Sequence, residues 1–199
     1  MILLLIIFQG FRTIFAPSVL FPATYPTNQY FPNIYNFSLS HTWKVNEEFN
    51  PGIYGEIFVK NSDLYSDPYL QNPDLHLKLF TFGLGGCFDY KINDYFAVGA
   101  GLGIYRLGFN YPQAEEGGEI VEQQEARTNL GFYSSFALTK LIKQNWRLGA
   151  IIKIFIIGKN EDYYDYFDYY PPYDYNEYPP YFPSPLQGIS LGLCLGYER

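Results

Sequence analysis

The chain has 199 residues and a net charge of −7; 17% of its residues are charged and 21% are aromatic. This length suits one domain with a closed core. The negative charge excludes nucleic acid as a partner, because phosphate binding needs clustered Lys and Arg. Few charges beside many rings and 18 glycines predict a wall with one apolar face and one wet face.

An apolar run, ILLLIIF, occupies positions 2–8 near the N-terminus. The run is short for a secretion signal, and no Lys or Arg precedes it. Residues 1–10 are therefore either the remnant of a signal peptide or the start of the first strand. Residues 11–199 are predicted to form a single domain.

Alternation of apolar with small or polar residues recurs along the whole chain, and no segment has a sustained helical period. Such alternation is typical of β-strands whose two faces meet different surroundings. The first segment is the least regular, because Pro17 and Pro22 interrupt it. The sequence predicts eight strands, at residues 11–21, 33–45, 52–60, 75–92, 95–110, 126–142, 146–159 and 187–199.

The predicted connections alternate in length. Short ones lie at residues 46–50, 93–94 and 143–145, and longer polar or proline-rich ones separate them. The longest, residues 160–186, is rich in Tyr, Pro and Asp. This order is typical of an outer-membrane barrel with short periplasmic turns and long extracellular loops. We therefore predict an all-β fold, a closed up-and-down antiparallel transmembrane β-barrel of eight strands.

The side-chain pattern predicts which face of each strand points outward. Along residues 95–110, bulky side chains such as Phe96 and Leu102 alternate with Gly99, Gly101 and Gly103. An eight-stranded barrel is only just wide enough inside for side chains, so rows of Phe, Trp and Ile from most strands would overfill it. We therefore expect the bulky rows to face lipid and the glycines to line a narrow, hydrophilic lumen.

Charged residues of both signs fall on the predicted inner face. Because buried charges need partners, we expect them to form salt bridges and a hydrogen-bonded plug rather than an open pore. The predicted lumen charge network consists of Lys44, Glu56, Lys60, Asp89, Lys91, Arg127, Arg147, Lys153 and Glu198.

The last strand carries a further signal. Ser190, Gly192, Leu195 and Tyr197 provide a polar residue, a glycine and two spaced hydrophobic residues. With this motif and the predicted architecture, the chain resembles the small eight-stranded outer-membrane barrels of the OmpA and OmpX type. The resemblance implies a bacterial outer-membrane location, contact with membrane lipid, and recognition of Ser190 to Tyr197 by the barrel assembly machinery. It implies no single activity, and the added Glu198-Arg199 tail departs from the pattern.

The segment 161–185 contains six Asp or Glu and no Lys or Arg. It is interpreted either as a solvated loop that shields the barrel mouth or as a surface that recognises an extracellular partner, since Tyr supplies large contact area at low entropic cost. The spacing of its acids does not match an EF-hand loop, and no metal is expected. The candidate binding residues are Tyr163, Tyr164, Asp165, Tyr166, Asp168, Tyr169, Tyr173 and Tyr175.

Other candidate sites are weaker. The glycines from Gly99 to Gly103 lie within one strand with no helix after them, which excludes a dinucleotide fingerprint. His41 and His76 fall on the lipid-side parity, and no nucleophile–base pair is identifiable. Cys87 and Cys194 lack metal-ligand spacing.

A periplasmic aromatic girdle is predicted at Trp43, Tyr90, Tyr95, Phe96, Trp146 and Tyr197.

The sequence therefore predicts a non-enzymatic structural protein of the outer membrane, without a cofactor, whose loops serve surface adhesion or ligand recognition. One alternative is a narrow porin-like solute channel. The other is a lipid-modifying enzyme, in which His76 would act with Ser66 or Asp74.

Overall fold

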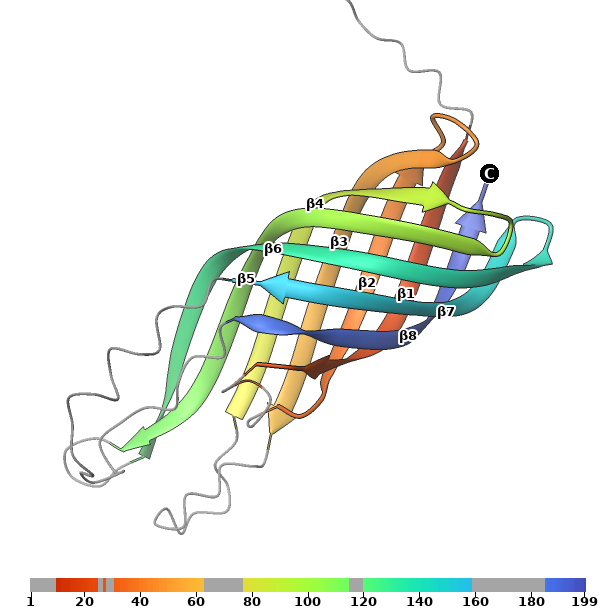
Figure 1. The fold of residues 1–199 in the computed structure, drawn as a ribbon. Helices are drawn as coiled ribbons and strands as arrows, with labels where there is room; N and C mark the ends of the chain where they lie inside the picture. The colour runs from red at the N-terminus through yellow and green to blue at the C-terminus, as the bar shows by residue number, and fades with distance from the viewer. Residues whose placement is uncertain (1–9, 25–26, 28–30, 63–76, 115–119, 159–184) are drawn as a thin grey trace, which may run out of the picture.

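The computed structural model describes residues 10–24, 27, 31–62, 77–114, 120–158 and 185–199. They form eight antiparallel strands in a closed barrel, and each strand pairs with its neighbours in the chain (Figure 1). No helix within these residues is long and apolar enough to cross a membrane. The strands are β1 (Phe11–Pro22), β2 (Ile34–Trp43), β3 (Phe49–Ser62), β4 (Leu77–Lys91), β5 (Phe96–Ala114), β6 (Ile120–Lys143), β7 (Trp146–Ile157) and β8 (Leu186–Glu198).

The ring closes where the first and last strands meet. The backbone N–H of Phe11 donates to the carbonyl of Arg199 over 2.8 Å, and the N–H of Arg199 donates to the carbonyl of Phe11 over 2.9 Å. The C-terminus therefore lies beside the start of β1, at the same end as the short turns (Figure 1). We call this the turn end of the barrel and the opposite end the loop end. The predicted eight strands and their order are confirmed.

Two of the short turns are held by asparagine side chains. Asn46 Oδ1 accepts hydrogen bonds from the backbone N–H groups of Glu48 and Phe49, at 2.9 and 2.6 Å. Asn93 Oδ1 accepts from Tyr95 and Phe96 in the same way, at 2.9 and 2.8 Å. Asn favours turns because its side chain can satisfy backbone groups that no strand partner reaches.

The alternation of faces follows the prediction. On β5, Leu102 and Ile104 are 63% and 60% exposed on the outside, whereas Ala97 and Tyr105 are buried inside. Leu130 on β6 is 70% exposed, and large apolar side chains point outward from every strand. The outer surface is therefore a continuous apolar band around the barrel.

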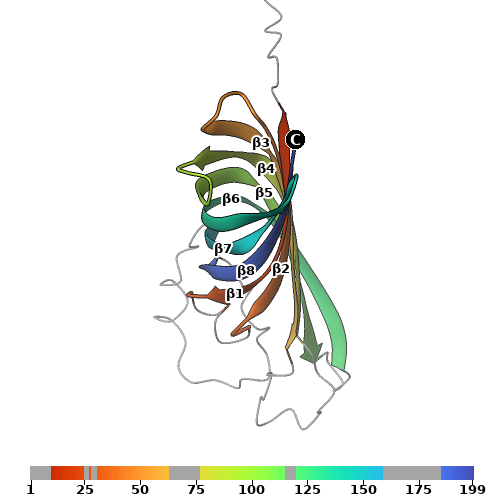
Figure 2. The same cartoon turned by 90° about the vertical axis from the view of Figure 1, so that its right-hand side faces the viewer.

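Three strands are clearly longer than predicted, and one of them is β3, which runs from Phe49 to Ser62 where the sequence suggested 52–60. The sequence suggested strands at 95–110 and 126–142, but β5 runs to Ala114 and β6 begins at Ile120. The extra residues pair with each other as far as Ala114 opposite Ile120, and this hairpin reaches beyond the other strands (Figures 1 and 2). The added part of β6 contains Glu122, Gln123, Gln124 and Glu125 in a row, so the apolar alternation that marks a strand is absent from the sequence there.

The lumen differs from the prediction in the half near the loop end. It is filled with buried apolar and aromatic side chains and is not a hydrophilic bore. The reason is visible on β5, where the inward positions change from glycine to bulky residues. Tyr105, Leu107 and Phe109 point inward, whereas the charged Arg106 points outward. The buried side chains in this half include Leu20, Phe31, Ile34, Phe58, Leu77, Leu79, Leu107, Phe109, Ile157 and Leu186.

The inward glycines make room for aromatic rings. A Cβ atom on Gly83 or on Gly131 would meet the ring of Tyr105, from β4 and β6 respectively, and a Cβ on Gly101 would meet the ring of Tyr133. Glycine in a strand often marks such a close approach. The glycine rows were predicted to line the lumen, and they do. The space that their missing side chains leave is occupied by the rings of Tyr105 and Tyr133.

Candidate functional site

The centre of the lumen holds a buried ion pair. Lys153 Nζ on β7 lies 2.6 Å from Glu56 Oε1 on β3, and the two side chains are 7% and 0% exposed. The hydroxyl of Tyr105 donates to Glu56 Oε2 over 2.8 Å and lies 2.9 Å from the hydroxyl of Tyr54. The ammonium of Lys153 also sits 4.5 Å above the ring of Tyr133. Each oxygen of Glu56 thus has a partner, as a buried carboxylate requires.

A layer of rings covers this network on the side of the loop end. Phe58 and Phe155 pack edge to face with ring centroids 5.2 Å apart, and Phe58 lies 6.3 Å from Tyr105. All three side chains are fully buried. The interior is packed at this level, so the lumen is closed there.

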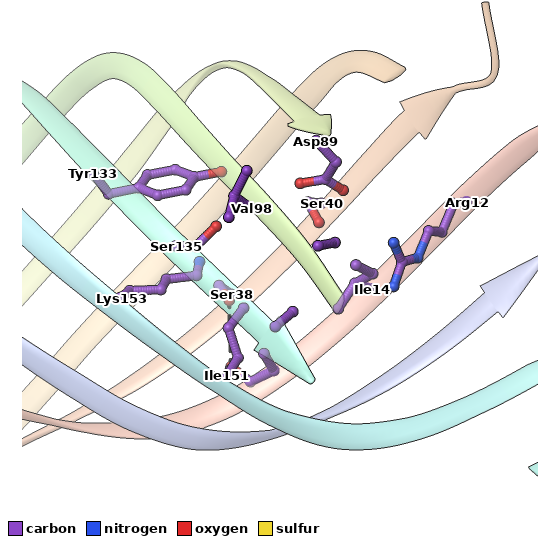
Figure 3. A pocket seen from close by; sticks show the side chains of 13 residues that line it. Arg12, Ile14, Ser38, Ser40, Asp89, Val98, Tyr133, Ser135, Ile151 and Lys153 are labelled. Atoms are coloured by element: carbon purple, nitrogen blue, oxygen red, sulfur yellow. Dashed lines mark hydrogen bonds between the residues drawn. The ribbon is translucent and has the colours of Figure 1, made fainter. Parts of the chain in front are cut away.

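A small cavity of about 20 Å³ lies on the other side of the ion pair (Figure 3). Arg12, Asp89 and Lys153 line it together with Ser40 and Ser135. Arg12 Nε and Asp89 Oδ2 are buried without a hydrogen-bond partner within the described part of the chain. A polar cavity of this size has room for about one water molecule.

A wider vestibule of about 460 Å³ lies at the turn end. Glu198 accepts from Lys44 Nζ at 2.7 Å and from Arg147 Nε at 2.8 Å. Across the same opening, Lys91 Nζ lies 2.9 Å from Asp94 Oδ1 in the turn between β4 and β5. This hydrogen bond and the charge of Lys91 hold the pKa of the Asp94 carboxyl below its ordinary value.

Six of the predicted lumen charges pair with one another or border the small cavity. In the interior, Glu56 pairs with Lys153, and Asp89 borders the small cavity. At the vestibule, Lys44 and Arg147 share Glu198.

The other three predicted charges contact groups outside the predicted set. Lys60 donates to Asn33 Oδ1 over 2.9 Å, and Arg127 lies 2.8 Å from Glu125. Lys91 pairs with Asp94, as described above. Sequence reasoning also missed Arg12, Tyr54 and Tyr105. A signal for Tyr105 was present, because it has the same parity as the inward glycines of β5.

The eight candidate binding residues from Tyr163 to Tyr175 and the candidate His76 lie outside the described residues. His41 lies on the outer face, where its Nδ1 is 2.9 Å from Thr13 Oγ1. Its ring stacks on Phe11 at 5.3 Å and contacts Trp43 at 5.2 Å. These surroundings provide no acid or base partner for His41 within the described part of the chain.

Comparison with known proteins gave matches among solved structures only. No family model matches the sequence, and neither does any curated protein. The chain is similar to Ail, the attachment invasion locus protein of Yersinia pestis, in a crystal structure with the heparin analogue sucrose octasulfate: the identity is 13%, the TM-score is 0.50, and the match covers 96% of this chain and 97% of Ail.

Two further matches have lower TM-scores. One is the crystal structure of Neisserial surface protein A, with 10% identity, a TM-score of 0.43, and coverage of 94% of this chain and 95% of that one. The other is the outer membrane protein Ail of Yersinia pestis in a phospholipid bilayer nanodisc, with 14% identity, a TM-score of 0.46, and coverage of 96% and 100%. Together with the closed ring of eight antiparallel strands, the similarity to Ail shows that this chain has the fold of the small outer-membrane β-barrel proteins.

Proposed function

We propose that this protein is an integral outer-membrane β-barrel with a closed, non-conducting lumen, and that its loop end faces the cell exterior. The apolar outer band supports the membrane location. Leu193 is 65% exposed and Leu102 is 63% exposed, and both belong to rows of outward apolar side chains. Such a surface is stable against hydrocarbon and would aggregate in water.

The proposal of a closed lumen rests on the tightly packed centre of the barrel. Glu56 is 1% exposed, and Phe58, Tyr105 and Phe155 are 0% exposed. Solvent therefore does not reach this level from either end. A solute channel, the alternative function, would need a continuous hydrated path past these four side chains.

Two measurements on the protein refolded into phospholipid vesicles test this proposal. A folded barrel should migrate differently on a detergent gel before and after boiling. In planar bilayers we expect no stable conductance steps. Regular nanosiemens steps would establish the channel and overturn the closed lumen, and identical migration of boiled and unboiled protein would overturn the barrel.

We also propose that the loop end of the barrel recognises an extracellular partner. β6 pairs with β7 only from Gly131 onward, so residues 120–129 have no strand partner on that side within the described part of the chain. An exposed strand edge can accept a strand from another protein. The sequence adds the tyrosine-rich acidic segment 161–185, whose charge disfavours polyanions of the kind bound to Ail.

Deleting residues 162–181 tests this recognition role. We expect the shortened protein to fold, with an unchanged shift on detergent gels, and to lose adhesion of expressing cells to a protein-coated surface. Unchanged adhesion would exclude recognition by this segment. The non-enzymatic role has its own test: lipid analysis of expressing cells should reveal no new acylation pattern, and a pattern that disappears in His76→Ala would establish the enzyme instead.

A further inference from the structure

One cation stands apart from the ion pairs described above. Arg106 on β5 lies on the outer face of the barrel, because its neighbours Tyr105 and Leu107 are fully buried inside and Arg106 itself is exposed. Its side chain makes no ion pair or hydrogen bond with the described residues. An unpaired guanidinium on a lipid-facing surface is costly unless it lies at a membrane boundary.

The position of Arg106 along the strand places it at such a boundary. It follows Phe96, which adjoins the short turn, by ten residues. At a rise of about 3.4 Å per residue and a strand tilt of about 40°, these residues span about 26 Å along the membrane normal. The apolar band of an outer-membrane barrel is about 25 Å tall. Arg106 therefore lies where acyl chains end and headgroups begin.

The surface around Arg106 is amphipathic. Its outward neighbours across the sheet are Phe82 on β4 and Thr128 on β6, which pair with it in register. On the side of the turn end lie Ile104 and Leu130, exposed by 60% and 70%. The acyl chains of a lipid can lie along these apolar side chains while its headgroup reaches the guanidinium.

Among the residues that the structure describes, no carboxylate pairs with Arg106. The outward acid on the adjoining part of β6 is Glu122, which accepts from Lys78 Nζ at 2.9 Å and from Asn110 Nδ2 at 3.2 Å. Glu122 precedes Thr128 by six residues along a strand, or about 20 Å. Arg106 is thus free to form the bidentate hydrogen bonds that guanidinium groups make with phosphate.

We propose that Arg106, with Phe82, Ile104 and Leu130 beneath it, binds a phosphorylated glycolipid of the outer leaflet, with the phosphate on the guanidinium. The inference rests on the proposed membrane location. Lys140 provides a matched control, because it is an outward-facing cation on β6 at the turn end and belongs to the opposite leaflet.

The test measures glycolipid bound per protein by native mass spectrometry, after reconstitution into phosphatidylcholine vesicles that contain lipopolysaccharide. We expect Arg106→Gln to weaken binding about tenfold, which corresponds to the loss of one charge-assisted contact. Arg106→Lys should keep part of the binding, and Lys140→Gln should bind like the unaltered protein.

Three outcomes would overturn the inference: full binding by Arg106→Gln, an equal loss in Lys140→Gln, or displacement of the glycolipid by inorganic phosphate at equal concentration. The last would identify a site for free phosphate. The shift on detergent gels is recorded for each sample. A protein that shows the shift and binds no glycolipid refutes only this inference, whereas loss of the shift in the unaltered protein refutes the proposed function.

Discussion

Lys153 Nζ and Glu56 Oε1 lie 2.6 Å apart in the middle of the barrel, although 97 residues separate them in the chain. They come from β7 and β3, which do not pair with each other. Only closure of the ring brings the two side chains together, and the rings of Phe58, Tyr105 and Phe155 shield them from water. The contact between Lys153 and Glu56 therefore forms only when the ring of strands is closed.

The first prediction concerns this pair. Lys153→Met leaves the Glu56 carboxylate buried without its cation, and we expect the free energy of unfolding in vesicles to fall by about 3–5 kcal/mol. Adding Glu56→Gln removes the stranded charge and should recover most of the loss. Lys44→Met is the control, because Glu198 keeps Arg147 and the site is partly exposed, so its cost should be under about 1 kcal/mol. Urea titration measures all three variants, and equal losses in Lys153→Met and Lys44→Met would contradict this account.

The second prediction concerns the inward glycines that contact the tyrosine rings. Gly83→Ala places a methyl group against the ring of Tyr105, and overpacking of this kind costs about 1–3 kcal/mol. Gly86→Ala on the same strand faces outward, where the nearest atom lies 3.9 Å from the new methyl group, and it should be neutral. Equilibrium unfolding distinguishes the two variants. A neutral Gly83→Ala would mean that the ring has room to move.

The third prediction concerns the apolar band. Leu102→Arg introduces a charge on the lipid face about midway between Phe96 and Arg106, and we expect a loss of about 2–4 kcal/mol in vesicles. Ile92→Arg carries the same change into the short turn between β4 and β5, where the expected cost is at most about 1 kcal/mol. If both variants unfold at the same urea concentration, the band does not face hydrocarbon.

The fourth prediction concerns pH. The hydrogen bond and charge of Lys78 hold the pKa of the Glu122 carboxyl below its ordinary value, with a further contribution from Asn110. The pair is fully formed at neutral pH and is lost as the pH falls through this lowered pKa. Lys78→Gln should raise the pKa of Glu122 toward its ordinary value, as measured by NMR titration of the carboxyl carbon. Lys140→Gln should leave it unchanged, and an identical titration in Lys78→Gln would refute the pairing.

The sequence predicted the strands because each outward row meets one environment along its length. Phe96, Leu102 and Ile104 repeat at every second position since they all face hydrocarbon, and Gly99 and Gly101 repeat between them. The short turns were also predictable, because Asn46 and Asn93 act on backbone groups two and three residues away.

The ends of β5 and β6 were not predictable in the same way. Past the apolar band both faces of the hairpin leave the lipid, so residues such as Gln123 and Gln124 show no alternation of polarity although they pair with Tyr111 and Asn110. At Arg106 the polarity of the two faces inverts, because Arg106 points outward while Tyr105 and Leu107 point into the lumen.

The amino-acid sequence by itself determined the fold class, the number of strands and the lipid-facing side, because period-two patterning is a local property that each strand carries alone. Tertiary structure decided the partners of Glu56, the seating of Tyr105 over Gly83 and Gly131, and the closure of the lumen. These depend on how far strands distant in the chain are staggered when the ring closes, and no single strand records that stagger.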